Sequence, residues 1–194
     1  MEESITRAFQ ESIRVKERFF RDNIANIIDV SRLIADTFIK GNKLVLFGNG
    51  GSATDASHIA GEFINRFKRD RPGLPAIALN TDMAVITSIA NDYDYSEVFA
   101  RQLKALAVEG DIAIAISTSG SSPNVLKAVD AAKKRRLKVI VFTGSKGDKF
   151  AAKADYAFVV PSDNTPRIQE THITIGHILC QIVEEILFEN PKKK

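Results

Sequence analysis

Short runs of consecutive apolar residues alternate with longer helical stretches, and this alternation restricts the fold more than any other feature of the chain. Residues 112–116 and 139–142 are apolar at every position. Strands of this kind are typical of a parallel sheet that helices cover on both faces. We therefore predict an α/β fold, a three-layer sandwich around a five-stranded parallel sheet of the flavodoxin-like type.

The predicted elements follow one another in regular order. Apolar residues recur at helical spacing from Ile5 to Ile13 and again from Ile24 to Phe38, which predicts an N-terminal helical pair. Strands are expected at residues 43–47, 75–79, 112–116, 138–142 and 158–160, and further helices at 52–67, 96–108, 123–135 and, as a long C-terminal helix, 167–188. The chain then divides into the helical pair at 1–40, packed on the same domain, the α/β domain at 41–190, and a lysine tail at 191–194.

Charge and cysteine content exclude several classes of protein. The 27 Lys and Arg exceed the 24 Asp and Glu by three, which the lysines at 192–194 account for. Basic clusters at 66–69 and 133–136 fall where helices end, a position that favours cations, so we expect no nucleic-acid partner. No apolar run approaches the roughly 18 residues of a membrane span, and Cys180 is the only cysteine. We expect a cytoplasmic protein without a membrane partner.

A glycine-rich loop, Gly48–Ser52, follows the first predicted strand. Ligands of doubly wound sheets bind where such loops enter helices, and three glycines let the backbone approach a ligand closely. A tight turn with Ser52 as the helix N-cap explains the same residues. With Ala53 the loop also fits the dinucleotide pattern, but no acidic residue follows at the expected distance of about 20 positions.

A second loop, Ser117–Ser122, carries five hydroxyl groups between an apolar strand and a helix that begins at Pro123. Hydroxyls and free backbone N–H groups at the positive end of a helix can hold a phosphate dianion without a lysine. A solvated serine-rich turn is the alternative, but a plain turn needs one capping residue and no ring of hydroxyls. The loop predicts a phosphate site.

Two predicted helices carry residues suited to acid–base or metal chemistry. His58 and Glu62 are four positions apart and share one helix face. Gln169 and His177 on the last helix are eight apart, about 80° around its axis. Each histidine alone is more often structural, and only the set of four favours a site. His172 lies nearer the apolar stripe, which indicates a core or interface role.

Together with Asn91-Asp92 and Arg66, whose structural and functional interpretations stay open, these segments form an ordered series. The series resembles the phosphoheptose isomerase family of SIS-type sugar isomerase domains over nearly the whole chain. The residues that carry the resemblance are Gly48–Ser52, His58 with Glu62, Arg71–Ala78, Asn91-Asp92, Ser117–Gly120, and Arg167–Glu170 with His177.

The resemblance implies an enzyme that converts sedoheptulose 7-phosphate to D-glycero-D-manno-heptose 7-phosphate, towards nucleotide-activated heptose for lipopolysaccharide and related surface polymers. It implies Glu62 and His177 as the proton carriers, a homotetramer, and a zinc ion held by His58, Glu62, Gln169 and His177. The candidate substrate-binding residues are Asn49, Gly50, Gly51, Ser52, Glu62, Arg66, Asn91, Asp92, Ser117, Thr118, Ser119, Ser122 and Gln169.

One position departs from the family pattern, because Pro166 stands where some members carry an aspartate. A catalytic carboxylate is therefore not expected there. The alternative functions are a non-catalytic SIS protein that binds the bacterial replication initiator and a module that senses sugar phosphates. Glu62 and His177, which non-catalytic relatives tend to lack, favour the enzyme.

Overall fold

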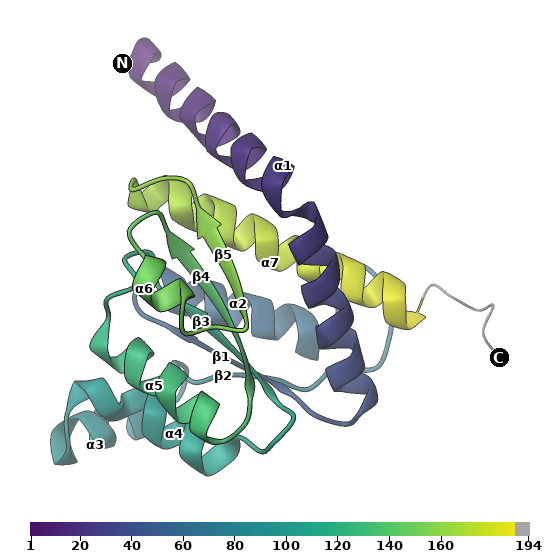
Figure 1. The fold of residues 1–194 in the computed structure, drawn as a ribbon, viewed down its shortest axis with the longest axis vertical. Helices are drawn as coiled ribbons and strands as arrows, with labels where there is room; N and C mark the ends of the chain where they lie inside the picture. The colour runs from purple at the N-terminus through teal and green to yellow at the C-terminus, as the bar shows by residue number, and fades with distance from the viewer. Residues whose placement is uncertain (189–194) are drawn as a thin grey trace.

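The computed structural model describes residues 1–188 as one parallel α/β sandwich (Figure 1). The sheet has the strand order β2-β1-β3-β4-β5, and each neighbouring pair is parallel. The strands are β1 (Leu44–Gly48), β2 (Ala76–Ala78), β3 (Ile112–Ile116), β4 (Lys138–Gly144) and β5 (Tyr156–Val160). The helices are α1 (Glu2–Ile39), α2 (Gly51–Ile64), α3 (Met83–Asp92), the 3-10 turn η1 (Tyr95–Glu97), α4 (Val98–Leu106), α5 (Pro123–Lys134), α6 (Asp148–Ala151) and α7 (Thr165–Phe188). The predicted five-stranded parallel sheet is confirmed.

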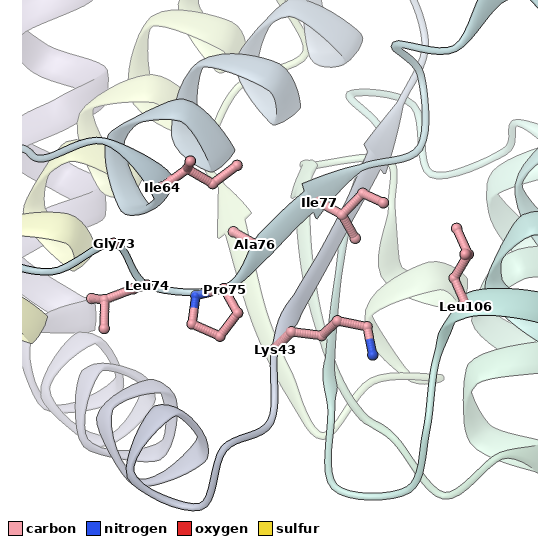
Figure 2. Close-up of a pocket in the computed structure, with 8 residues that line it drawn as sticks. All are labelled: Lys43, Ile64, Gly73, Leu74, Pro75, Ala76, Ile77 and Leu106. Carbon is pink, nitrogen blue, oxygen red and sulfur yellow. The ribbon is translucent and has the colours of Figure 1, made fainter.

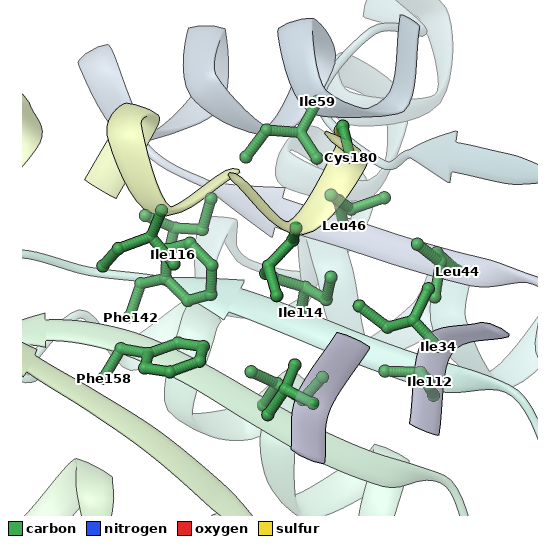
Figure 3. Packing of buried hydrophobic residues seen from close by; sticks show 14 of the residues in the cluster. Ile34, Leu44, Leu46, Ile59, Ile112, Ile114, Ile116, Phe142, Phe158 and Cys180 are labelled. Atoms are coloured by element: carbon green, nitrogen blue, oxygen red, sulfur yellow. The ribbon is translucent and has the colours of Figure 1, made fainter. Parts of the chain in front are cut away.

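Alternate residues of the central strands point to opposite faces of the sheet and belong to two separate hydrophobic cores. This is why these strands are apolar throughout. Leu44 and Leu46 of β1 pack on one face beneath α1, α2 and α7, while Val45 and Phe47 pack on the other face beneath α4 and α5. In β3 the isoleucines take the first face and the alanines take the second. Figure 3 shows the first core, where apolar side chains of β1, β3, β4 and β5 pack against helices that contribute Ile34, Ile59 and the buried Cys180.

The predicted N-terminal helical pair is wrong, because residues 2–39 form the single 38-residue helix α1. Neither glycine nor proline interrupts this stretch. Val15 and Phe19 continue the apolar pattern across the expected break and are buried. The C-terminal half of α1 packs on the domain, whereas Ile5 and Phe9 near its start are 71% and 67% exposed (Figure 1). The predicted lysine tail at 191–194 lies outside the described residues.

Helix α2 ends at Ile64, three residues before the predicted end at Phe67. The backbone N–H groups of Phe67, Lys68 and Arg69 donate to the carboxylate of Glu184 on α7 and so leave the helical pattern. The guanidinium of Arg71 donates to the same carboxylate at 2.8 Å, and its side chain is 1% exposed. The basic cluster at 66–69 is therefore a loop, while Lys133 and Lys134 lie in the last turn of α5 as expected.

The Glu184 carboxylate is held ionised by its donors. Burial raises the pKa of Glu184, but the amides of Phe67 and Lys68 and the Arg71 guanidinium outweigh burial and hold the pKa below that of an ordinary glutamate.

Among the described helices, none has a long enough apolar stretch to cross a bilayer.

Replacing Glu184 by Gln is expected to lower the free energy of unfolding by about 3–5 kcal/mol, because Arg71 would stay buried without its carboxylate. Urea unfolding at neutral pH measures this loss. Glu109→Gln is the matched control: Glu109 pairs with Arg136 at the surface, with side chains 67% and 77% exposed, and its loss should stay within about 1 kcal/mol. Equal losses in the two variants would contradict this role of Glu184.

Candidate active site

The carboxyl ends of β1 and β3 place the two predicted ligand loops side by side. Gly48 at the end of β1 pairs with Ile116 at the end of β3, and a β-carbon at Gly48 would lie 2.8 Å from the Ile116 carbonyl oxygen. Gly50 has a φ of 56° and caps α2. Ser52 is therefore not the N-cap that the turn interpretation predicts, and it is buried inside the first turn of the helix.

A reciprocal amide pair joins the glycine loop to the first turn of α5, directly after the serine-rich loop. The Asn49 side chain donates to Asn124 Oδ1 at 2.8 Å, and the Asn124 side chain donates to Asn49 Oδ1 at 2.9 Å. The Tyr95 hydroxyl also donates to Asn49 Oδ1, at 3.2 Å. Sequence reasoning missed Asn124 and Tyr95, because neither residue type stands out in a helix start or a turn.

The serine-rich loop is organised by its own hydroxyls. Gly120 takes a φ of 65°, and its N–H donates to Ser117 Oγ at 3.2 Å. The hydroxyls of Ser119 and Ser121 lie 2.9 Å apart, and those of Ser117 and Ser122 lie 3.4 Å apart. Ser122 precedes α5 but its side chain does not cap the helix. Pro123 has no N–H, and the N–H groups of Val125 and Leu126 donate to Asn124 Oδ1 and to the Ser122 carbonyl oxygen. The hydroxyls and the positive end of α5 are therefore what suit this loop to an anion.

His58, Glu62 and His177 come together between α2 and α7, although 119 positions separate the two histidines in the sequence. His58 Nε2 lies 3.0 Å from Glu62 Oε1 and 3.3 Å from His177 Nε2. One nitrogen or oxygen from each of the three side chains lies within 4.8 Å of the others. The two helices approach closely at Gly176, where a β-carbon would meet Ile59 Cδ1 at 2.5 Å.

The surroundings of His177 favour its neutral form. Phe67 packs against the imidazole at 5.6 Å between ring centroids. Burial lowers the pKa of His177, the positive charge of His58 lowers it further, and Glu62 acts in the opposite direction. A neutral imidazole can both accept and donate a proton.

Gln169, on α7, lies beside Gly51 at the amino end of α2. Its side-chain nitrogen is 2.3 Å from the position that a β-carbon on Gly51 would take, so this glycine makes room for the amide. Gln169 and His177 are about 12 Å apart along α7. The described contacts bring Gln169 to the glycine loop and not to the three-residue cluster, and its part in metal binding stays a prediction.

Asp55 is a residue of this region that sequence reasoning missed. It lies on α2 three positions before His58, and its Oδ2 is buried without a hydrogen-bond partner among the described residues. Burial raises the pKa of Asp55 to about 6, against the effect of His58. The signal in the sequence was its helical spacing from His58 and Glu62.

The remaining predicted residues lie at the surface. Asn91 and Asp92 end α3 and hydrogen-bond each other at 2.9 Å. Arg66 is exposed and lies beyond the end of α2, although the predicted helix at 52–67 includes it. Pro166 occupies the first turn of α7, where its missing N–H removes no helical hydrogen bond.

His172 lies in the core, as its position near the apolar stripe indicates. It is fully buried beside Phe142, with 5.6 Å between ring centroids. Its Nε2 lies 3.3 Å from the Thr143 carbonyl oxygen, and its Nδ1 has no partner among the described residues. Burial lowers the pKa of His172 to about 4.

An apolar hollow at the opposite edge of the sheet is not a candidate site. Figure 2 shows it at the amino ends of β1 and β2, lined mostly by aliphatic side chains such as Ile64, Ile77 and Leu106. The ammonium of Lys43, its one charged group, is paired with the buried Asp111 at 2.6 Å. Ligands of parallel α/β sheets bind at the carboxyl edge, where the two loops lie.

Comparisons with known proteins agree with this geometry. A family model described as SIS domain matches residues 9–144. A phosphoheptose isomerase of Thermodesulfovibrio yellowstonii is 67% identical over 194 residues, which cover 100% of this chain and 96% of the relative. This chain belongs to the phosphoheptose isomerase family. A second member, from Aquifex aeolicus, is 49% identical over 97% of this chain and 99% of its own length.

Solved structures of the phosphoheptose isomerase family share the fold. The enzyme of Neisseria gonorrhoeae superposes with a TM-score of 0.89 at 38% identity, covering 95% of this chain and 98% of that one. That of Francisella tularensis has a TM-score of 0.91 at 38% identity, covering 94% and 97%. Membership of this family argues against the dinucleotide-binding interpretation of the glycine loop.

The depressed pKa of His172 predicts an acid-labile fold. The unfolded chain takes up a proton at this imidazole near pH 6.5 and the folded chain near pH 4. The contribution of His172 to the free energy of unfolding should therefore be fully present above pH 6.5. It should decrease as the pH falls from there, by up to about 1.4 kcal/mol per pH unit. Urea unfolding between pH 7 and pH 4.5 measures the slope.

In His172→Gln, the free energy of unfolding should fall less steeply with decreasing pH, because the group that takes up a proton on unfolding is absent. Thr171→Val is the control, because Thr171 is equally buried on the same turn of α7 and does not titrate. The prediction is wrong if His172→Gln and the wild type lose stability in parallel.

Proposed function

We propose that this chain isomerises sedoheptulose 7-phosphate to D-glycero-D-manno-heptose 7-phosphate, with Glu62 and His177 as its catalytic residues. The observation that carries the proposal is the meeting of Glu62 and His177 around His58, on α7 and on the helix α2 that begins in the glycine loop. Relatives from Thermodesulfovibrio yellowstonii and Aquifex aeolicus, matched over nearly their whole lengths, are named phosphoheptose isomerase and support the reaction.

The phosphate of the substrate is assigned to the Ser117–Ser122 loop. The hydroxyls there and the amino end of α5 offer hydrogen-bond donors and a positive dipole end. Binding energy from this remote group fixes the other end of the sugar and helps turnover as well as affinity. Asn49, Gly50 and Gly51 are assigned to the sugar, and Asn91 and Asp92 remain proposed contacts.

Proton transfer between C1 and C2 passes through an enediol and needs a base at carbon and a proton carrier at the oxygens. We assign the carbon proton to the Glu62 carboxylate, whose side chain is 24% exposed and so open to a ligand. His177 serves the two oxygens, because burial and the neighbouring His58 lower its pKa and so favour the neutral imidazole. The cluster places acid and base groups within one small space.

Glu62→Gln is expected to lower kcat at least about 100-fold, the usual contribution of general base catalysis. A coupled assay with sedoheptulose 7-phosphate measures it, and the metal content of the same preparation shows whether a lost ion explains the loss. Glu185→Gln is the control, since Glu185 is a partly buried carboxylate on α7 that bonds Gln181. Normal turnover by Glu62→Gln would eliminate the assignment.

The three-residue cluster fits a zinc ion. Ligand atoms about 2.0–2.2 Å from a tetrahedral zinc lie roughly 3.3 Å from one another, and the two contacts of His58 Nε2 measure 3.0 and 3.3 Å. His58, Glu62 and His177 would hold the ion, with Gln169 as a proposed fourth ligand. When bound, zinc would stabilise negative charge that develops on the enediolate oxygen.

Elemental analysis of the purified protein is expected to find about one zinc per chain, and a chelator should remove it. His58→Ala should lose the metal, because it deletes the central nitrogen of the cluster. His172→Gln, which changes a buried histidine outside the cluster, should keep it. Equal metal content in His58→Ala and wild type would exclude this zinc site.

We also infer a homotetramer in the cytoplasm that supplies heptose for lipopolysaccharide or a related surface polymer. An apolar stripe of Ile5, Phe9 and Ile13, which are 71%, 67% and 40% exposed, supports assembly, since a patch of this kind suits another protein surface. The buried, unpaired Cys180 fits a reducing compartment. The chemistry of the product, a heptose phosphate, supports the place in polymer synthesis.

A further inference from the structure

We propose that Asn124 is a positioning residue that locks the glycine loop to the phosphate loop, so that the two bind substrate as one rigid surface. The inference rests on the proposed function, because it concerns how the isomerase holds its phosphosugar. Asn124 itself is only 2% exposed, and its side-chain amide is bonded to Asn49. It acts through Asn49.

The hydrogen bonds of Asn124 leave no freedom for its side chain. Its Oδ1 accepts from the Asn49 amide at 2.8 Å and from the N–H of Val125 at 2.9 Å. Its Nδ2 donates to Asn49 Oδ1 at 2.9 Å. One residue is thus bonded to the backbone of the first turn of α5 and, by two bonds, to the loop after β1.

The pair also determines what Asn49 can do. Both lone pairs of Asn49 Oδ1 are used, one by Asn124 and one by the Tyr95 hydroxyl at 3.2 Å. The carbonyl oxygen of this amide is therefore unable to accept from a sugar hydroxyl. The glycine loop must then offer the substrate mainly its backbone N–H groups at Gly50 and Gly51, which lie at the amino end of α2.

Rigid spacing of the loops matters for a substrate with a phosphate at one end and its reacting carbons at the other. The phosphate loop fixes one end, and the glycine loop precedes the helix that carries His58 and Glu62. A misplacement of about 1 Å at a reacting centre can slow a reaction about 100-fold. A buried amide pair is a strong constraint because breaking it leaves unsatisfied polar groups.

A double-mutant cycle tests the proposal with two readouts: the dissociation constant for inorganic phosphate, by titration calorimetry, and KM and kcat for sedoheptulose 7-phosphate. Asn124→Ala is expected to weaken phosphate binding about tenfold and to lower kcat by up to about 100-fold, because the loops that hold the two ends of the substrate lose their fixed spacing. Because Asn124 acts through Asn49, the Asn49→Ala/Asn124→Ala double variant should bind phosphate no more weakly than Asn49→Ala alone.

Gln102→Ala is the matched control, since Gln102 is a buried amide, 7% exposed, that makes two hydrogen bonds to the Leu79 and Val98 carbonyls outside the site. It should lower the melting temperature as Asn124→Ala does and leave phosphate affinity within twofold. If Asn124→Ala does not fold, Asn124→Ser gives the same comparison with a smaller packing change.

Two outcomes overturn the inference: an Asn124 variant whose phosphate affinity matches that of Gln102→Ala, or fully additive effects in the cycle. Failure of the proposed function is a different result, in which the wild type binds phosphate but does not interconvert the two heptose phosphates. The phosphate titration needs no turnover, so the two failures are distinguishable.

Discussion

Burial of the sheet on both faces is the constraint on which the rest of this structure depends. Strands with two apolar faces require helices above and below, and helices that return the chain to the same edge make every strand parallel. The carboxyl ends of all the strands then lie along a single edge of the sheet. This is why a glycine loop and a serine loop that are far apart in the sequence share a border through Gly48 and Ile116.

The same constraint brings the ends of the chain together. α2 follows the first strand and α7 follows the last, yet both cover one face of the sheet and contact each other. A carboxylate and an imidazole that no local pattern connects therefore come within a few ångströms. The acid–base chemistry proposed for this protein therefore depends more on the order of the strands and helices than on any local motif.

The sequence predicted the strands, the sheet and the pairing of His58 with Glu62 because each depends on periodicity, whereas the place of His177 beside them followed from the family resemblance alone. A two-faced apolar run has few alternatives, and His58 and Glu62 must share a helix face. It did not predict the single helix α1, whose continuity depends on Val15 and Phe19, nor the early end of α2, which a carboxylate 117 positions from Phe67 imposes. Asn124 was missed because a reciprocal amide pair depends on the spacing of two loops, which no single segment encodes.

The close approach of α2 and α7 at Gly176 links packing to electrostatics. Gly176 directly precedes His177, and its neighbour Ile59 directly follows His58. This contact is thus one residue away from both imidazoles. A methyl group added at Gly176 would meet the end of the Ile59 side chain, which would have to move, and the rearrangement would take place directly beside the two rings. A residue that has no side chain therefore lets α7 pack against α2 directly beside the cluster.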